Sequence, residues 1–296
     1  MSHWIETYRG TVHRWELDTV DHFTVAYYFD RFGDATANAL DALELGPGTL
    51  GRLAHASGSA VRAAAADCHV RYRRELRAGD VLHIMSGVIA VDADGVVIGH
   101  KLFDSDGDHL CASVEQRMRL VAGASAVGLT PEQQRALASR RVAWDGPARE
   151  ARATPASDEG FRVCGRDVVM PWEIDVTGQC AMSHYIHRFS AATVQLIALF
   201  GMTPAYQRDE HIGFSTFEFQ LAFFDELHAG DPVLVKSALL HLGTSSMHAL
   251  HRMYNARTGV LVAMLLQMGV HLDMAARRST PLPAALRERA KAMLVA

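Results

Sequence analysis

A chain of 296 residues is long enough for about two domains that each bury a core. A net charge of −4 and a sequence pI of about 6.5 exclude a general attraction to nucleic acid or to an acidic membrane surface. No apolar run reaches the roughly 18–20 residues that span a bilayer, and the N-terminus lacks the apolar segment of a signal peptide, so we expect a cytoplasmic protein. The cysteines show no CxxC spacing, which favours ordinary thiols in a reducing compartment: Cys68, Cys111, Cys164 and Cys180.

In the first half, an extended segment at 10–17 precedes a long helix and four runs of strand character. Apolar side chains recur along the helix at three- and four-residue spacing, which predicts one buried face: Tyr28, Phe32, Ala35, Ala39 and Leu43. Polar side chains occupy the face expected to be exposed: Asp30, Arg31, Asp34 and Asn38. Turn sequences separate the strand runs, which we place at 66–73, 80–91, 96–103 and 109–121.

The second half repeats this order. Its extended segment is 164–174, its helix presents Tyr185, Phe189, Ala192, Leu196 and Phe200 on one face, and its strand runs are 215–224, 232–241, 245–254 and 259–272. Between the halves, residues 123–160 predict a linker with a short helix at 130–141. That helix has Thr130 as its N-cap, followed by Pro131 and Gln133. The tail at 281–296 predicts a final helix.

Two segments carry one sequence pattern, WELDTVDHFTVAYYFDRF at 15–32 and WEIDVTGQCAMSHYIHRF at 172–189. The identities pair Trp15 with Trp172, Glu16 with Glu173, Asp18 with Asp175, Tyr28 with Tyr185, Arg31 with Arg188 and Phe32 with Phe189. CHVRYRRELRAGD at 68–80 likewise matches FQLAFFDELHAGD at 219–231. The first half has about six more residues before this strand, which we place at 46–60. The chain is therefore two copies of one fold.

We expect an α+β fold in which each copy is a long helix wrapped by an antiparallel sheet of about five strands. The predicted domains are 1–122 and 161–296, joined by the linker at 123–160.

The repeated motif resembles that of the tandem hotdog-fold acyl-CoA thioesterases of the 4-hydroxybenzoyl-CoA thioesterase type. That family has an Asp at the start of its long helix, often Gly-His at the third and fourth positions after it, and a Tyr at the tenth. Here Asp18 is followed by His22 at the fourth position and by Tyr28 at the tenth. The later AGD, LGTSS and LVA segments, clearest across 215–273, are also similar to the family pattern.

The second copy departs from this pattern at the histidine. Asp175 is followed by Gly178 and Tyr185 at the third and tenth positions, but Gln179 stands where the family has His. Neither copy has the Val-Asn-Asn that often follows the His. The two halves need not be equivalent.

The resemblance implies two fused hotdog domains that hydrolyse an acyl-CoA or acyl-carrier thioester to free acid and thiol. The implied catalytic residues are Asp18, His22 and Asp175. One carboxylate acts as base or nucleophile, while amides at the helix N-terminus stabilise the oxyanion. Those amides belong to Val25 and Ala26 in the first copy and to Met182 and Ser183 in the second. No cofactor is expected, coenzyme A being part of the substrate.

Three further residues are candidates for substrate contact. Tyr28 is expected in the core or the pocket wall. Arg71 and Arg73 alternate on one predicted strand face, where they could meet the phosphates of coenzyme A or simply protect a solvated edge. No metal is expected, since the HxxH spacing of His184 and His187 has neither an HExxH context nor a Cys/His cluster.

The residues leave alternatives open. An Asp ahead of a helix is often only an N-cap. A hotdog dehydratase or hydratase would act on the same thioesters, although it wants a GDxNPxH-like loop that this chain lacks, and a non-catalytic acyl-thioester-binding protein would share the fold. The partner is a small-molecule acyl thioester, with no nucleic acid and no membrane. The acyl group, the active half and a homo-oligomer of such tandem units are left open.

Overall fold

The computed structural model describes residues 3–52 and 60–295, which form two compact units. The first unit comprises Met1–Glu16 and Tyr27–Ala148, and the second comprises Leu17–Ala26 and Arg149–Ala296. The segment Leu17–Ala26, which carries Asp18, thus makes its contacts in the second unit although it belongs to the first copy in sequence. The stretch expected to be a linker lies in the first unit up to Ala148.

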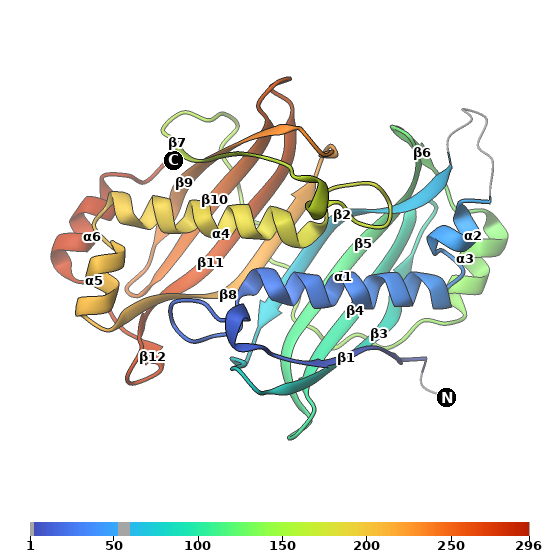
Figure 1. The fold of residues 1–296 in the computed structure, drawn as a ribbon, viewed down its shortest axis with the longest axis horizontal. Helices are drawn as coiled ribbons and strands as arrows, with labels where there is room; N and C mark the ends of the chain where they lie inside the picture. Colours follow the sequence, from blue (N-terminus) through green and yellow to red (C-terminus); the bar gives the residue numbers. More distant parts are fainter. Residues whose placement is uncertain (1–2, 53–59, 296) are drawn as a thin grey trace. The chain divides into compact units, whose positions relative to one another are not determined.

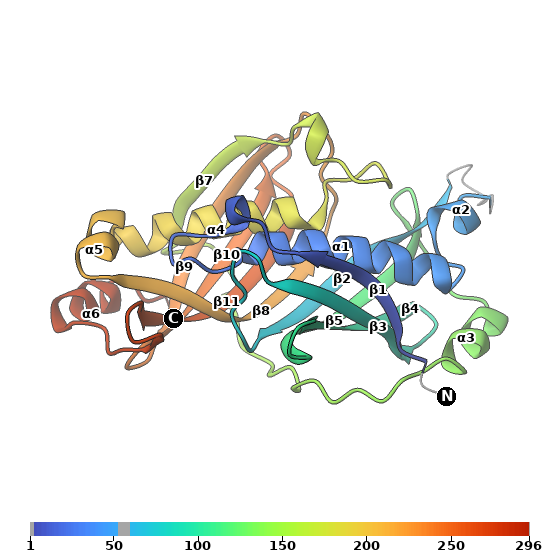
Figure 2. The same cartoon turned by 60° about the horizontal axis from the view of Figure 1, so that its bottom comes forward.

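The first unit is an antiparallel sheet with one long helix, α1 (Val25–Ala42), lying across one face (Figure 1, Figure 2). Its strand order is β1 (Ile5–Thr11), β3 (Val81–Val91), β4 (Gly95–Asp104), β5 (His109–Ala122) and β2 (Val61–Tyr72), with β6 (Ser125–Val127) paired to β5. Two short helices complete it, α2 (Pro47–Leu50) and α3 (Pro131–Ala138). Of the segment expected to hold the extra residues, 53–59 lie outside the described ranges.

The second unit repeats this plan with α4 (Met182–Leu199) across its sheet (Figure 1). Its strand order is β7 (Arg162–Val168), β9 (Pro232–Leu242), β10 (Ser246–Asn255), β11 (Leu261–Asp273) and β8 (Ile212–Phe223), with β12 (Arg278–Ser279) paired to β11. Its short helices are α5 (Pro204–Asp209) and α6 (Ala284–Lys291). The expected α+β double hotdog is confirmed.

The two sheets are interrupted at equivalent places, which is independent evidence of duplication. A β-bulge inserts one residue into a strand and bends it. The bulged residues of the first sheet are Thr7, Ala66, Ile89 and Cys111, and those of the second are Cys164, Phe217, Leu240 and Val262. The copies therefore share local irregularities as well as strand order.

Both helices bury the face that their periodicity predicts. Along α1, Tyr28, Phe32, Ala35 and Ala39 are buried and Leu43 packs against the core. Along α4, Tyr185, Phe189, Ala192 and Leu196 are buried, with Phe200 directly after the helix. The predicted helix at 130–141 is α3, where Thr130 and Gln133 form the expected capping box. All four cysteines are buried free thiols.

The expected extended segments at 10–17 and 164–174 overlap the first strand of each unit but continue too far along the chain. The strands lie earlier, at β1 and β7, and each is followed by a short 3-10 turn, η1 (Arg14–Glu16) or η2 (Pro171–Glu173). The Glu16 carboxylate accepts the His13 N–H at 2.8 Å, and the Glu173 carboxylate accepts the Met170 N–H at 2.8 Å. These bonds close the turns and end the extended conformation.

A buried polar network joins helix and sheet in each unit. His100 is fully buried, with Nδ1 2.7 Å from the Ser86 hydroxyl and Nε2 3.3 Å from the Thr36 hydroxyl. Thr36 in turn donates to the Gln116 side chain at 2.8 Å. The second unit has the same arrangement in His251, Ser237, Thr193 and Gln267. Burial lowers the pKa of both imidazoles to about 4, so they are neutral structural groups.

Candidate active site

Each copy has a five-residue turn directly before its long helix, and a predicted catalytic aspartate begins it. The Asp18 N–H donates to the His22 carbonyl at 2.8 Å, and the Asp175 N–H donates to the Gln179 carbonyl at 2.8 Å. Bridges between Leu17 and Phe23, and between Ile174 and Cys180, close the two turns at their bases. The repeat in the sequence is therefore a repeat of backbone conformation.

The two carboxylates bind their own turns. Asp18 Oδ1 accepts the Val20 N–H at 2.9 Å and the His22 N–H at 3.0 Å. Asp175 Oδ1 accepts the Thr177 N–H at 2.7 Å, the Thr177 hydroxyl at 2.6 Å and the Gln179 N–H at 3.4 Å. The alternative in which these aspartates are helix N-caps is wrong, because the amides they bind precede the helices.

The third position after each aspartate adopts a left-handed backbone. Gly178 has φ +84° and Asp21 has φ +56°. Glycine tolerates this region because it has no Cβ, and Asp is among the residues that enter it most readily. This requirement explains the Gly that the family pattern has at the third position.

The helices begin just after these turns, so the first residue of each helix lies seven positions after its aspartate. Val25 and Ala26 open α1, and Met182 and Ser183 open α4. Amides in the first turn have no acceptor within their own helix, and they carry the positive end of the helix dipole. The four predicted oxyanion residues thus occupy first-turn positions.

The Asp18 turn is packed firmly within the second unit. Val20 is buried and lies so close to Gly213 that a Cβ on that glycine would collide with it. Arg277 Nη1 donates to the Val20 carbonyl at 3.2 Å, and Arg277 Nη2 contacts His22 Nε2. The structure therefore brings Asp18, His22 and an unpredicted arginine together.

The protein around Asp18 raises the pKa of its carboxyl, although one side stays open to solvent. Burial is the main cause. The backbone N–H groups of His22 and Val20, together with the charge of Arg277, act in the opposite direction. A carboxylate with a raised pKa at the amide end of a helix is suited to general-base chemistry.

The Asp175 turn has different surroundings. Asp18 and Asp175 are both exposed, but Val20 in the first turn is buried, whereas Thr177 at the equivalent position is only half-buried. Gln179 takes the place of His22. The two copies thus share a backbone conformation but not the side chains that act on the carboxylate.

The two repeated tyrosines lie in the core. Tyr28 is 3% exposed and packs edge-on against Tyr72, with ring centroids 5.1 Å apart. Tyr185 is 4% exposed and packs edge-on against Phe223 at 5.2 Å. Burial raises the pKa of the Tyr185 hydroxyl, which keeps it protonated at neutral pH. Both tyrosines are therefore core residues near the N-terminal end of their helices.

Arg71 and Arg73 do not share one strand face, which corrects the expectation from their spacing. β2 ends at Tyr72, because the N–H groups of Arg73 and Arg74 both turn to the Cys111 carbonyl, at 2.8 and 3.2 Å. Arg71 is half-buried in the strand and Arg73 is exposed beyond it. Their contact with coenzyme A phosphates stays a prediction.

The repeated Glu and Arg form an ion pair in each copy, which the sequence analysis did not predict. Arg31 contacts the Glu16 carboxylate and is not on an exposed face as expected, while Arg188 Nη2 donates to Glu173 at 2.7 Å. Each pair ties the turn before the helix to the helix itself. Their identity in both copies was the available signal. Arg277, by contrast, has no counterpart in the motif.

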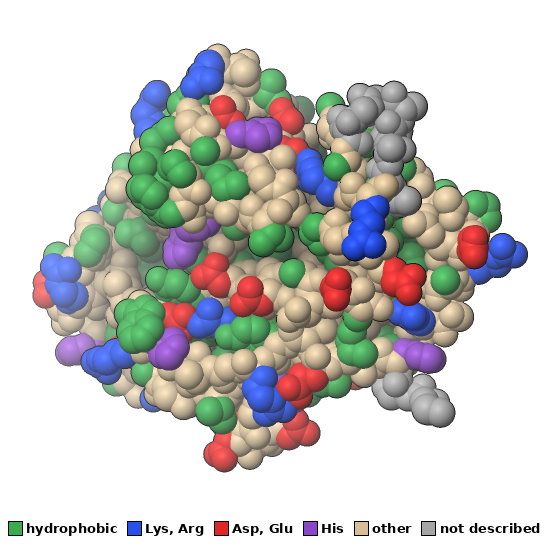
Figure 3. Space-filling view, turned by 45° about the vertical axis from the view of Figure 1, so that its right-hand side comes forward, with side chains coloured by type: hydrophobic (Ala, Val, Ile, Leu, Met, Phe, Trp, Pro, Cys, Tyr) green, Lys and Arg blue, Asp and Glu red, His purple; other side chains and the backbone are tan. Residues whose placement is uncertain are grey.

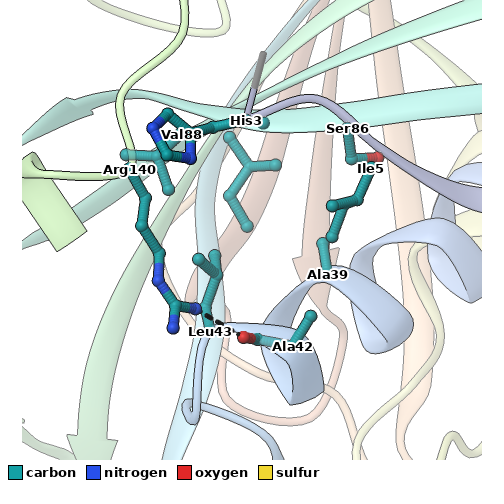
Figure 4. A pocket seen from close by; sticks show the side chains of 10 residues that line it. His3, Ile5, Ala39, Ala42, Leu43, Ser86, Val88 and Arg140 are labelled. Carbon is teal, nitrogen blue, oxygen red and sulfur yellow. Dashed lines mark hydrogen bonds between the residues drawn. The ribbon is translucent and has the colours of Figure 1, made fainter. Parts of the chain in front are cut away.

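A cavity of about 240 Å³ lies in the first unit, at the end of α1 remote from Asp18 (Figure 4). Apolar side chains of α1 and the sheet line it, and Arg140 at its rim donates to the Ala42 carbonyl at 2.7 Å. In the second unit, the larger Leu196 occupies the helix position that aligns with Ala39. This cavity takes no part in the Asp18 site.

Within residues 3–52 and 60–295, no group of three or more His, Cys, Asp or Glu side chains is arranged to hold a metal ion. No helix in the part of the chain that the structure describes combines the length and apolar character needed to cross a membrane. Figure 3 shows acidic and basic side chains interspersed on one face of the protein.

The fold and the aspartate-bearing turns define a double-hotdog protein of the thioesterase class. The family model of the Thioesterase-like superfamily matches residues 12–145 and again residues 169–290, and the chain belongs to that superfamily. Thioester hydrolysis is accordingly its reaction class.

Individual relatives agree with this assignment. The betainyl-CoA thioesterase of Pseudomonas aeruginosa is 28% identical over 125 residues, which are 42% of this chain and 79% of that protein. An acyl-ACP thioesterase from Bacteroides thetaiotaomicron is similar in structure, with TM-score 0.69 and 10% identity, covering 91% of this chain and 100% of that one. The 12:0-ACP thioesterase from Umbellularia californica has TM-score 0.68 and 10% identity, covering 92% and 98%. These two structures establish the shared fold.

Proposed function

We propose that this protein hydrolyses an acyl-CoA thioester at the Asp18 turn. The observation that carries the proposal is the position of the Asp18 carboxylate, which two hydrogen bonds within its turn fix shortly before the amide end of α1. The surrounding protein also raises the pKa of this carboxyl. Membership of the thioesterase superfamily supports the reaction, and the geometry of the turn supports the residue.

In the proposed reaction, water adds to the thioester carbonyl carbon while the Asp18 carboxylate accepts its proton. The first-turn amides of Val25 and Ala26 stabilise the oxyanion, each by about 3 kcal/mol. Collapse of the intermediate breaks the C–S bond and releases the acid and the thiolate, which then takes up a proton. In an alternative path the Asp18 carboxylate attacks the carbonyl carbon itself and the C–S bond breaks, which releases the thiolate and leaves an acyl-enzyme anhydride. Water then hydrolyses the anhydride to the free acid and the Asp18 carboxylate.

His22 is proposed to orient the attacking water or to hydrogen-bond the substrate. It lies in the same turn as Asp18, and its backbone N–H donates to Asp18 Oδ1 at 3.0 Å. The Asp175 turn lacks this imidazole, so we propose the first copy as the main reacting site.

For the substrate we propose a coenzyme A thioester ahead of an acyl-carrier thioester. The support is the curated relative, which is named a betainyl-CoA thioesterase. Betainyl-CoA therefore belongs in the first substrate panel, beside short and medium straight-chain acyl-CoAs.

We propose that the reaction needs no cofactor and takes place in the cytoplasm. Four buried free thiols suit a reducing compartment. A homo-oligomer of tandem units stays a proposal to be tested by light scattering.

The test is release of free thiol from the acyl-CoA panel, followed with a thiol-reactive dye for the wild type, Asp18→Asn and Asp175→Asn. Asp18→Asn removes the proton acceptor with little change in shape, so we expect kcat to fall by about 100- to 10,000-fold. Asp175→Asn is the matched control at the equivalent position of the other copy, and it should keep most of the activity.

Other outcomes would replace this proposal. A change in enoyl-thioester absorbance without thiol release would indicate a hydratase, and tight binding with neither signal would indicate a binding protein. Loss of thiol release in Asp175→Asn alone would move the reaction to the second copy.

A further inference from the structure

The hairpin that carries Arg277 is longer than its counterpart in the first unit. In β11–β12, the last paired residues are Asp273 and Arg278, with four residues, 274–277, between them. In β5–β6, the equivalent pair is Ala122 and Ser125, with only two residues between them. Arg277 thus lies in a turn that is two residues longer than its counterpart in the first unit.

This longer turn is held in a defined conformation. Asp273 Oδ1 accepts the N–H groups of Ala275 and Ala276 at 2.9 and 2.8 Å, and the Met274 N–H donates to the His211 carbonyl at 3.0 Å. Arg277 follows with a left-handed backbone, φ +52°. An arginine in that region is uncommon, so the surrounding bonds fix its direction.

The Arg277 side chain binds the Asp18 turn at two points. One nitrogen donates to the Val20 carbonyl at 3.2 Å, and another contacts His22 Nε2. A guanidinium has only donors, so His22 Nε2 must be the acceptor. The imidazole is then neutral and carries its proton on Nδ1.

We propose that Arg277 is a positioning residue that fixes the Nδ1–H tautomer of His22 and orders the Asp18 turn for the reaction. This inference rests on the proposed function. It explains why the two copies differ: the Asp175 turn has Gln179 in place of His22, and the shorter β5–β6 hairpin ends its turn without an arginine.

The charge of Arg277 also predicts how the pH dependence of activity should change when this arginine is removed. The Arg277 guanidinium is a permanent positive charge near the Asp18 carboxyl, and it lowers the pKa of that carboxyl against the larger effect of burial. Removing Arg277 therefore raises the pKa of Asp18 further. Because the Asp18 carboxylate must be ionised to act as the base, the acid limb of the pH–activity profile should then move to higher pH.

The experiment compares Arg277→Gln, Arg277→Lys and Arg278→Gln in the full-length protein. Arg278 is the neighbouring exposed arginine in β12 and serves as the matched control. Thiol release is measured as kcat and KM across pH with one acyl-CoA that the wild type hydrolyses. Nitrogen-15 NMR of labelled histidine, with His22→Gln for assignment, reports the His22 tautomer without reference to activity.

For Arg277→Gln we expect roughly tenfold lower kcat, the size of one lost charge-assisted hydrogen bond, with little change in KM. The acid limb of its pH profile should move to higher pH, and the His22 signal should leave the neutral Nδ1–H form. Arg277→Lys should restore the position of the acid limb more fully than the Nδ1–H form of His22, since a lysine supplies the charge without the planar guanidinium group. Arg278→Gln should match the wild type.

The possible failures are distinguishable. If the wild type is active, and the pH profile and His22 NMR signal of Arg277→Gln both match it, the positioning role of Arg277 is overturned. The proposed function is unaffected by that result. A wild type that releases no thiol from any substrate overturns the proposed function, whereas the NMR comparison still decides whether Arg277 sets the tautomer.

Discussion

At the scale of single residues, the aspartate turn shows how one side chain fixes a backbone. The Asp18 and Asp175 carboxylates each bind amides two and four residues ahead, and that closes a loop whose third position must be left-handed. The turn that these bonds build ends shortly before the helix N-terminus. Structure and proposed chemistry are therefore inseparable at this residue.

The left-handed position predicts an effect on stability. Gly178→Ala should lower the free energy of unfolding by about 1–2 kcal/mol, because an L-residue is strained there. A Cβ at Gly178 meets no atom within 4 Å, so only the backbone is affected. Urea unfolding followed by circular dichroism measures the change.

The control for Gly178→Ala is Gly33→Ala. Gly33 lies within α1 at an exposed position, and a Cβ there also meets nothing within 4 Å. Alanine favours a helix, so this variant should gain up to about 1 kcal/mol. Equal shifts in both variants would contradict the assignment of strain to the turn.

At the scale of elements, each long helix is tied to its sheet by a buried histidine network as well as by apolar packing. His100 lies on β4 and links β3 through Ser86 and α1 through Thr36. His251 on β10 does the same in the second unit. A protonated imidazole at these sites would lack water, so charging it opposes folding.

These histidines predict a loss of stability in acid. Their pKa is about 4 in the folded protein against 6.5 for the ordinary group. Between those values the unfolded chain binds more protons, so stability falls as pH drops from about 6.5 towards 4 and is fully present above that window. Each histidine contributes on the order of 3 kcal/mol to this change.

Urea unfolding of the wild type, His100→Gln and His251→Gln at several pH values between 7 and 4 tests this account. The free energy of unfolding of each variant should fall less steeply as the pH drops. In the middle of the window, the difference in slope should correspond to about one bound proton. Parallel curves for all three proteins would show that the networks do not titrate as described.

The elements themselves were largely predictable from the repeated motif and the periodicity. The run at 232–241 became β9 at Pro232–Leu242, and 109–121 became β5 at His109–Ala122. β8 starts at Ile212, ahead of the predicted Ser215, because its pairing with β11 continues beyond the predicted run. The first strands were predicted to continue too far, because turns closed by Glu16 and Glu173 cannot be distinguished from extended chain by apolar pattern alone.

At the scale of the whole molecule, duplication preserved the framework and changed what surrounds each aspartate. Bulges, ion pairs and histidine networks recur in both units, whereas His22 and the long β11–β12 turn do not. Arg277 could not be predicted, since it meets His22 across 255 positions of sequence and no motif marks it. Repeats predict the common fold, and the differences between copies carry the functional asymmetry.

A structure of Asp18→Asn with an uncleaved acyl-CoA bound is the most direct test of the central claim. The account predicts that the thioester carbonyl oxygen lies about 2.7–3.1 Å from the first-turn amides of α1, at Val25 or Ala26, with its carbon facing residue 18. A carbonyl bound only beside the Asp175 turn, or in the cavity at the far end of α1, would contradict it.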